Sequence, residues 1–563
     1  MSTSVPERRA DIPLVLVLTV FTACYAPFVA KPFHMDDPLF LWTARQILTK
    51  PFDFYGYSVN WYYFSEPAAH VIQNPPLASY YVALAASLFG WSEVALHLAF
   101  LLPALAVVVG TYRLAQELSV SPWVAALTAS LTPAFLVSST TVMCDVLMLS
   151  GWTWSIALWV RGMRSGRTSL LGASALLASL AVVTKLSAAG LVPLLLVYGV
   201  LKERRVGPWA LWLLLPVGAV AGLEWAMTSL YGRGLFLNAG SYAGRVHETH
   251  GYEVFSKVLT GLIFMGGAYL PVAFQVGRLC SRRAVLAALA LWAAVTGALV
   301  VTGHIGGLSL SGGDGLRWGI VLQCALLLVI GLGLVALAVV ELVETRTAEA
   351  VLLLMWIGGI LLFATRLNWS VNVRSLLPAA PAVGILVAQR AGRRSGGGAP
   401  APAWRAALPF VPAAIASILV AQADQALACT GRRAAGELAA IASAKSPRVW
   451  FQGHWGFQYY AEQHGLQPVD YLRTRLSPGD RILVPEKSTN VFQLPVEAVR
   501  IESTARYEPL SWLATMDSAV GAGFYSDTWG PLPFAIGSVP ARSYLVLVAV
   551  EVAGPLGDRG LHR

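Results

Sequence analysis

The sequence predicts an all-α polytopic membrane protein with a small α/β domain at its C-terminal end. Of its 563 residues, 56% are hydrophobic and only 12% are charged, which is about half the charged fraction of an ordinary soluble domain. Apolar runs of about 20 residues, the length that crosses a bilayer as a helix, recur along most of the chain. These observations argue against a soluble multidomain protein.

About thirteen apolar runs are long enough to span a membrane as helices. They lie near residues 12–30, 93–117, 121–140, 143–161, 168–183, 186–202, 208–230, 256–276, 283–303, 317–340, 348–365, 372–390 and 405–425. The runs between residues 168 and 202 can also be merged or divided differently.

The basic residues predict how these helices are oriented. Arg8 and Arg9 precede the first run, which places the N-terminus in the cytoplasm, and every second connection should then be cytoplasmic too. Those connections read RGMRSGR, LKERR, RLCSRR and QRAGRRSGGGAPAPAWR, so the Lys and Arg clusters fall on one side, as the positive-inside rule requires. Loop anchoring therefore accounts for the net charge of +10, and no nucleic acid partner is predicted.

Two regions on the opposite side are too long to be simple connections. Residues 31–91 contain two aromatic-rich stretches that we interpret as amphipathic helices lying at the membrane interface. After residue 430 the hydropathy falls; RVWFQG, DRILVP and SYLVLVAV are typical of short strands, and GFQYYAEQHG is typical of a helix. The chain is thus predicted to divide into a transmembrane domain, 1–430, and a soluble external or periplasmic domain, 431–563. The aromatic GHWGFQYY could contact lipid or sugar, but burial in the core of this domain is the favoured interpretation.

Neither a cofactor nor a structural metal is indicated. The five cysteines lie far apart, mostly within apolar runs and without CxxC spacing, so neither a disulfide framework nor a zinc site is predicted. The sequence shows no P-loop and no GxGxxG signature for a nucleotide. A requirement for a divalent metal stays open.

Six charged residues are predicted to lie near the outer ends of the spans. They are Asp36, Asp37, Asp145, Lys185, Arg366 and Arg374. Ionisable groups near hydrocarbon are costly, so we interpret them as functional residues. Together they would supply acids and bases to a cavity at the outer interface.

Structural roles compete with this interpretation. Asp37 precedes a proline, which fits an N-cap followed by proline at N1 and would leave Asp36 as the free carboxylate. Asp145 could likewise cap the helix that follows it. Lys185 could extend toward the lipid head groups, and Arg374 could pair with a lipid phosphate.

The order of these features resembles that in the dolichyl-phosphate-mannose–protein mannosyltransferase family. That family is glycosyltransferase family 39-like and lies in the GT-C superfamily. The bacterial lipid A aminoarabinose transferases belong to the same group. The resemblance covers roughly residues 10–390. It rests on the acidic pair after the first span, NPPL at 74–77, GWSEVALHLAFLLPALAVVVGTYRLAQEL at 90–118, Asp145, Thr184–Lys185 and VRSLLPAAP at 373–381. The family usually has Asp-Glu where this chain has Asp36-Asp37.

This resemblance implies a glycosyltransferase that moves a hexose or pentose from a polyprenyl-phosphate donor to an acceptor on the outer face of the inner membrane. The acceptor would be a lipid, a glycan or a protein. Three carboxylates would be catalytic, with the first as general base: Asp36, Asp37 and Asp145. Three cations would bind the donor phosphate: Lys185, Arg366 and Arg374.

A membrane transporter or a flippase for a lipid-linked sugar is the alternative function. Such proteins also place charges within the membrane, but they tend to show repeated halves and broken helices near the midplane. Here no repeat is visible, and the charges gather at one interface. The sequence therefore favours the transferase.

Overall fold

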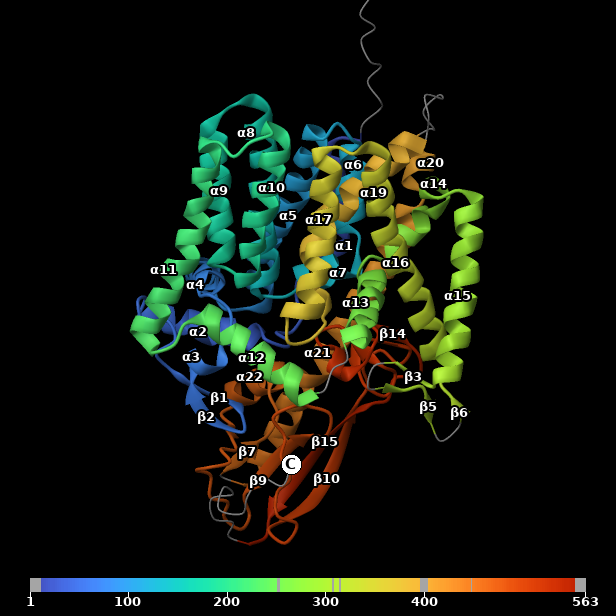
Figure 1. Ribbon diagram of the computed structural model, residues 1–563. Coiled ribbons are helices and arrows are strands. Elements are labelled where there is room, and N and C mark those ends of the chain that lie inside the picture. The colour runs from blue at the N-terminus through green and yellow to red at the C-terminus, as the bar shows by residue number, and fades with distance from the viewer. Residues whose placement is uncertain are drawn as a thin grey trace, which may run out of the picture.

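The computed structural model of the chain describes residues 12–250, 254–305, 308–312, 315–394, 403–446 and 448–551. A bundle of long helices carries a smaller mixed α/β unit at one end (Figure 1). This arrangement confirms the predicted fold class, a multi-pass helical membrane protein with a small α/β unit near its C-terminal end.

Every predicted span contains helix. In chain order these helices are α1 (Leu14–Tyr25), α5 (Glu93–Glu117), α6 (Pro122–Ser130), α7 (Pro133–Ser139), α8 (Cys144–Ser165), α9 (Thr168–Val182), α10 (Leu191–Glu203), α11 (Leu214–Tyr231), α13 (Val254–Ala268), α14 (Val276–Leu279), α15 (Arg282–Thr302), α16 (Trp318–Thr345), α17 (Ala348–Leu362), α19 (Ala380–Arg394) and α21 (Phe410–Ser443). By length and hydropathy, 7 helices of the described chain qualify as spans, or up to 9 if each of two bent pairs counts as one. The predicted number of about thirteen is therefore not confirmed.

The bent pairs explain part of this difference. The axes of α6 and α7 differ by 67°, and those of α13 and the segment that ends with α14 differ by 65°. Both bends occur beside prolines, Pro133 and Pro271, which cannot donate the backbone hydrogen bond that would continue a helix. A hydropathy scan sees one apolar run in each case because it does not register the bend.

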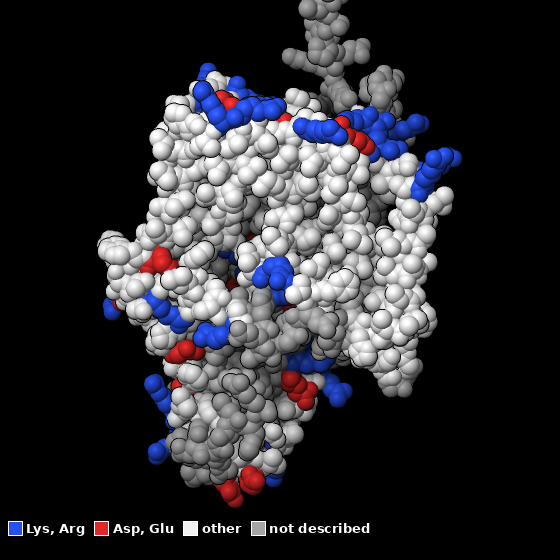
Figure 2. Space-filling view, in the orientation of Figure 1, with Lys and Arg blue, Asp and Glu red and all other residues white. Residues whose placement is uncertain are grey.

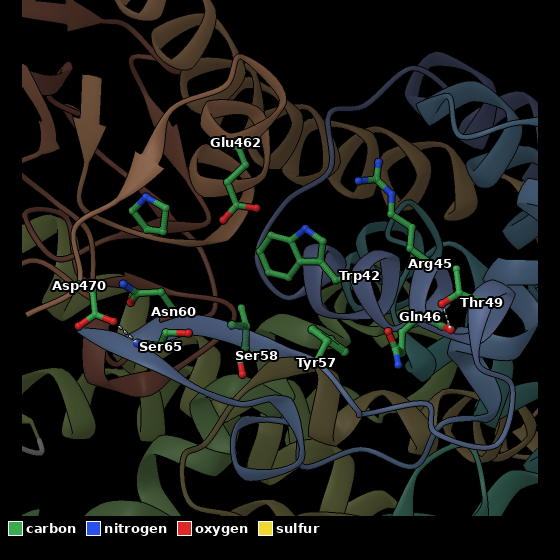
Figure 3. A pocket seen from close by; sticks show the side chains of 12 residues that line it. Trp42, Arg45, Gln46, Thr49, Tyr57, Ser58, Asn60, Ser65, Glu462 and Asp470 are labelled. Atoms are coloured by element: carbon green, nitrogen blue, oxygen red, sulfur yellow. Dashed lines mark hydrogen bonds between the residues drawn. The ribbon is translucent and has the colours of Figure 1, made fainter. Parts of the chain in front are cut away.

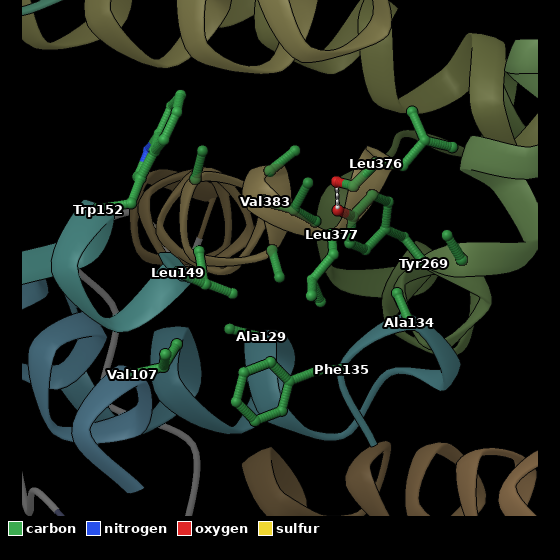
Figure 4. Packing of buried hydrophobic residues seen from close by; sticks show 14 of the residues in the cluster. Val107, Ala129, Ala134, Phe135, Leu149, Trp152, Tyr269, Leu376, Leu377 and Val383 are labelled. Carbon is green, nitrogen blue, oxygen red and sulfur yellow. Dashed lines mark hydrogen bonds between the residues drawn. The ribbon is translucent and has the colours of Figure 1, made fainter. Parts of the chain in front are cut away.

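Small residues and buried aromatic rings hold the bundle together. A Cβ on Gly266 of α13 would lie 1.9 Å from the Leu327 carbonyl oxygen, and one on Gly331 of α16 would lie 2.0 Å from the Leu262 carbonyl oxygen. Glycine at both positions therefore lets these two helices approach closely. Figure 4 shows side chains from several helices meeting in the core, where the buried Tyr269 hydroxyl donates to the Leu376 carbonyl at 2.5 Å.

The first long loop contains a helix in each of the two aromatic-rich stretches, but the end of the first stretch, which was interpreted as helix, forms a strand of a hairpin instead. The helices are α2 (Asp37–Thr49) and α4 (Leu77–Phe89), and between them lie β1 (Ser58–Tyr62), β2 (Phe64–Pro67) and the single-turn α3 (Ala68–Val71). The strands β1 and β2 pair antiparallel. A further amphipathic helix that was not predicted, α12 (Leu235–His250), lies between α11 and α13.

The C-terminal unit is built on a five-stranded sheet in the order β10-β15-β9-β7-β8. Its elements are β7 (Val449–Phe451), α22 (Trp455–Gln463), β8 (Gln467–Pro468), β9 (Arg481–Pro485), β10 (Val499–Tyr507) and β15 (Arg542–Ala549). The strands β7, β9 and β15 and the helix α22 lie where the sequence predicted them. Phe457, Tyr459 and Tyr460 of the aromatic helix are buried, as the favoured interpretation expected. Their hydrophobic cluster is not that of the C-terminal unit alone, because it also contains residues of the first long loop such as Phe33 and Trp61.

This unit is closely joined to the bundle. Helix α21 runs without a break from Phe410 to Ser443, through the predicted boundary near residue 430. The chain between β10 and β15 then returns to the bundle, where Phe524 and Phe534 join the main hydrophobic core. The C-terminal unit and the helices therefore share packing as well as a covalent connection.

The basic connections gather at the end of the bundle opposite the C-terminal unit (Figures 1 and 2). They include Arg161, Arg164, Arg204, Arg205, Arg282, Arg283, Arg393 and Arg394. Arg8, Arg9 and residues 395–402 of the connection that follows Arg394 lie outside the described residues.

Candidate functional site

Four of the six predicted site residues form one hydrogen-bonded network. Arg374 donates through Nη1 to Asp36 Oδ2 at 2.7 Å and through Nε to Asp145 Oδ2 at 2.9 Å. Lys185 Nζ donates to the other oxygen of the same carboxylate, Asp145 Oδ1, at 2.5 Å. Two carboxylates and two cations thus alternate in the order Asp36, Arg374, Asp145, Lys185, which we call the charged network.

Each member of the charged network lies at an end of a helix. Asp36 immediately precedes α2, and Asp145 lies in the first turn of α8, where the helix dipole favours a carboxylate. Lys185 has an extended backbone between α9 and the short 3-10 helix Leu186–Gly190. Arg374 lies in α18 (Val373–Leu376), whose N-cap Asn372 accepts a hydrogen bond from the Ser375 N–H.

Burial differs strongly within the charged network. The side chain of Asp145 is 1% exposed, those of Arg374 and Lys185 are 12% and 16% exposed, and that of Asp36 is 34% exposed. A buried carboxylate requires cations and hydrogen bonds to offset its desolvation, and Asp145 receives both from two cations. Figure 2 shows a hollow above α12, between the lower ends of α10 and α17, with atoms of acidic and basic residues inside it.

The expectation that Asp37 caps the following helix is wrong. Helix α2 begins at Asp37 itself, so Asp36 occupies the N-cap position, without a capping side-chain bond. Asp37 is fully buried; its Oδ2 accepts from the His34 N–H and its Oδ1 accepts from the Val142 N–H, each at 2.8 Å. Asp37 therefore joins the start of the first loop to the segment that precedes α8, and burial raises its pKa to about 7.

Asp36 is consequently not the free carboxylate that the capping argument implied, because one of its oxygens is bound by Arg374. Its other oxygen, Oδ1, accepts no hydrogen bond from the described residues.

The structural alternatives for the other three residues are also resolved. Helix α8 has Met143 as its N-cap residue with no side-chain cap, so Asp145 does not serve that role. Lys185 and Arg374 are directed to the Asp145 carboxylate within the protein. Arg366 lies in the helical turn Phe363–Leu367 and is exposed; within the described chain no ion pair joins it to the charged network.

Sequence reasoning missed a second buried ion pair. Lys31 Nζ lies 2.5 Å from Asp424 Oδ2, and both side chains are 0% exposed. Asp424 also accepts hydrogen bonds from the hydroxyls of Tyr525 at 2.8 Å and Thr515 at 2.9 Å. The sequence could have indicated this pair, because Asp424 is a charged residue that interrupts an apolar run and Lys31 ends another such run. This cluster ties the start of the first loop to α21 and to the returning C-terminal chain.

No metal site is evident in the part of the chain that the structure describes, where no group of three or more His, Cys, Asp or Glu is arranged to hold an ion. All five cysteines are unpaired.

Comparison with known proteins finds a family model that matches part of the chain. A family model described as dolichyl-phosphate-mannose-protein mannosyltransferase matches residues 73–227. The resemblance to that family is confirmed. The matched segment contains two members of the charged network, Asp145 and Lys185. No curated protein sequence matches the chain at a significant level.

Solved structures with a similar fold are remote in sequence. The chain is similar to the apo oligosaccharyltransferase of Archaeoglobus fulgidus, with a TM-score of 0.46, 13% identity and coverage of 81% of this chain and 64% of that one. For ArnT from Cupriavidus metallidurans bound to undecaprenyl phosphate the TM-score is 0.40, with 14% identity and coverage of 84% and 92%. For the mycobacterial arabinofuranosyltransferase AftD the TM-score is 0.40, with 13% identity and coverage of 97% of this chain and 40% of that one. The chain thus spans less than two thirds of the length of the oligosaccharyltransferase.

Proposed function

We propose that the protein is an integral-membrane glycosyltransferase that takes a sugar from a polyprenyl-phosphate donor. The charged network carries the proposal, because it combines two ordered cations and a partly exposed carboxylate at one end of a helical bundle. The family match over residues 73–227 supports it.

The two cations suit a phosphate leaving group. When the bond between the sugar and the phosphate breaks, its electron pair stays on the phosphate oxygen, and nearby cations stabilise the developing charge. Lys185 gives one hydrogen bond and Arg374 two within the network, so both retain N–H groups that can bind phosphate. Asp145 holds the two side chains in place beforehand, which lowers the cost of ordering them during the reaction.

Asp36 suits the role of general base. Its side chain is the most exposed of the charged network, at 34%. In the proposed step, the acceptor hydroxyl attacks the anomeric carbon and passes its proton to Asp36 Oδ1, while the sugar–phosphate bond breaks. Arg374 contacts this base and would also contact the phosphate, so it couples the two ends of the reaction.

The other two predicted site residues receive different roles. Asp37 is a structural residue, since both of its oxygens are used by backbone N–H groups. Arg366 has no contact with the charged network and is left out of the phosphate site.

We also propose that the charged network and the C-terminal unit face the external or periplasmic side of the inner membrane, where a lipid, glycan or protein acceptor is met. The gathering of basic connections at the other end of the bundle supports this orientation (Figure 2). A cysteine at the exposed Gln463 should react with an impermeant maleimide in sealed cells, and one at the exposed Arg204 only after permeabilisation. The reverse pattern would overturn the orientation.

The donor can be tested directly. The purified protein in lipid nanodiscs is incubated with undecaprenyl-phosphate mannose, glucose, galactose or arabinose and a membrane extract as the source of acceptor. Release of undecaprenyl phosphate and transfer of labelled sugar are expected for one donor. If no sugar is transferred, and the intact lipid-linked sugar crosses the bilayer of proteoliposomes, the flippase is the correct function.

A further inference from the structure

A pocket lies between the first loop and the C-terminal unit (Figure 3). Its volume is about 550 Å³, which is in the range of small-molecule sites. Helix α2 and strand β1 contribute most of its wall, Glu462 of helix α22 also lines it, and none of the charged network residues does. The side chains that matter for its chemistry are Trp42, Arg45, Tyr57 and Glu462.

Two aromatic rings are held firmly in this pocket. Trp42 packs edge to face against the buried Trp61, with ring centroids 6.2 Å apart and planes at 84°. The Tyr57 hydroxyl shares a hydrogen bond of 2.9 Å with Thr43 Oγ1. Both Trp42 and Tyr57 remain partly exposed, so the pocket offers ordered apolar surfaces to a ligand at little entropic cost.

Polar groups surround these rings. The guanidinium of Arg45 lies 5.1 Å from the Trp91 ring centroid, which fixes its position. Glu462 accepts one hydrogen bond of 2.9 Å from Gln458 at Oε1, and within the described chain no donor binds its Oε2. Figure 3 shows the Glu462 carboxylate and the Trp42 indole projecting toward the same space.

Charge within the pocket is close to balanced. Arg45 carries a positive charge, while burial raises the pKa of Glu462 to about 7, so near neutral pH this carboxyl both donates and accepts hydrogen bonds. Asp470 also lines the pocket, but its carboxylate is bound by the backbone N–H groups of Ser65, Leu472 and Arg473. A strongly charged ligand, such as nucleic acid, finds no matching cluster of cations here.

The edge of strand β1 is already used, which argues against a peptide bound by strand addition. One side of β1 pairs with β2. Two further backbone groups of the strand are also bonded: the Asn60 carbonyl accepts from Gln458 Nε2 at 3.0 Å, and the Trp61 carbonyl makes a hydrogen bond of 3.1 Å with His454 Nδ1. The Asn60 side chain is buried and its amide is already hydrogen-bonded to the Val469 carbonyl and to Asn490. The open groups of the pocket are therefore other side chains, chiefly aromatic faces with carboxyl and guanidinium groups.

A saccharide has the complementary chemistry: apolar C–H faces that pack on aromatic rings, and many hydroxyls that pair with carboxyl and guanidinium groups. We infer that this pocket binds an oligosaccharide and, resting on the proposed function, that this oligosaccharide is part of the acceptor. Helix α2 connects the two places, since it begins beside Asp36 and carries Trp42 and Arg45 into the pocket. At about 1.5 Å per helical residue, Arg45 lies roughly 14 Å along the helix from Asp36, a span of a few sugar units.

Binding can be measured without turnover. The full-length protein in nanodiscs is titrated with neutral tetrasaccharides of glucose, mannose, galactose and arabinose, using saturation-transfer NMR and tryptophan fluorescence. One tetrasaccharide should bind the wild-type protein, and Trp42→Ala should weaken that binding at least tenfold. Trp42→Phe, which keeps an aromatic face, should bind better than Trp42→Ala and remains informative if the alanine variant misfolds.

A control variant tests whether the loss is specific to the pocket. Trp512→Ala removes another partly exposed tryptophan, outside the pocket, and should bind as the wild type does. The inference is overturned if no tetrasaccharide binds the wild-type protein, if a peptide panel binds instead, or if Trp42→Phe and Trp42→Ala both bind like the wild type. If the protein binds a saccharide but consumes no polyprenyl-phosphate sugar donor, the transferase function is refuted, while the assignment of the pocket as a saccharide site is still supported.

Discussion

Arg374 Nε donates to Asp145 Oδ2 at 2.9 Å, although 229 residues separate the two in the chain. The acceptor is the most buried member of the charged network, and the donor also contacts the partly exposed Asp36. Arg374 therefore links the buried Asp145 to Asp36, the carboxylate that is proposed to take the proton of the acceptor hydroxyl. Lysine could not make both contacts in this geometry, because its three N–H donors share one nitrogen, whereas Arg374 uses two separate nitrogens, Nε and Nη1.

Arg374→Lys is accordingly expected to behave like Arg374→Ala rather than like the wild type. Charge-assisted hydrogen bonds to phosphate are among the stronger polar contacts, and losing them should lower transfer at subsaturating donor by roughly tenfold or more, at about 1.4 kcal/mol per decade. Lys185→Ala should show a similar loss. The measurement is kcat/KM for the polyprenyl-phosphate donor.

Arg366→Ala is the matched control, since that arginine is exposed and lies outside the charged network. It should keep nearly full activity. If Arg366→Ala lost as much activity as Arg374→Ala, or if Arg374→Ala were fully active, the phosphate site would be wrongly assigned.

Much of this arrangement could be predicted from the sequence, because a bilayer imposes strong rules on length, hydropathy and charge. The apolar runs located the long helices of the bundle, though not α12 or the number of spans. The cost of burying charge singled out six residues, of which Asp36, Asp145, Lys185 and Arg374 form the charged network. The partners of these residues could not be predicted, because each contact joins segments far apart in the chain.

The errors have equally specific causes. Asp37 matched the pattern of an N-cap, but helix α2 begins one residue earlier than that pattern requires. The carboxylate instead accepts from the nearby His34 N–H and from the distant Val142 N–H. Local pattern reasoning cannot see a partner such as Val142, which lies 105 residues away. The buried Lys31–Asp424 pair was overlooked because each residue is an isolated charge whose partner is 393 residues distant.

Asp37→Asn is expected to lower the stability of the folded protein, and not only the rate of sugar transfer. Both carboxylate oxygens accept from buried backbone N–H groups, whereas an asparagine has one acceptor oxygen and would turn its NH₂ toward the other N–H. Leaving a buried donor unpaired costs about 1–3 kcal/mol. Thermal unfolding in detergent should show a lower Tm for Asp37→Asn than for Asp36→Asn, and an equal or higher Tm would contradict the structural role.

Asp424→Ala should be more destabilising still. The substitution leaves Lys31 buried without its counter-ion and removes the acceptor of the Tyr525 and Thr515 hydroxyls. Breaking a buried ion pair by removing one partner costs about 3–5 kcal/mol. Arg161→Ala, which breaks an exposed pair with Glu117, is the control and should cost about 0–1 kcal/mol. Similar losses of Tm in the two variants would show that the buried pair is not an important link.

The stability of the folded protein is expected to depend on pH through the protonation of Glu462. Its pKa in the folded protein is raised to about 7, mainly by burial, so the folded state favours the protonated carboxyl. This contribution is complete below the unfolded pKa of about 4.3 and is lost as the pH rises through about 7. The Tm of the wild-type protein should therefore fall relative to that of Glu462→Gln between about pH 5 and pH 8. Parallel curves for the two proteins would contradict the shift.

Asp36→Asn separates the enzyme from the flippase. Asparagine keeps the size of the side chain and can still accept a hydrogen bond from Arg374, but it cannot take a proton from the acceptor hydroxyl. Removing a positioned base costs about 10²–10⁴-fold in rate, while donor binding should survive because Lys185 and Arg374 are unchanged. The assay compares sugar transfer with binding of the same polyprenyl-phosphate donor in nanodiscs. Near-normal transfer by Asp36→Asn would refute the base assignment, and loss of donor binding together with transfer would make Asp36 a positioning residue for Arg374.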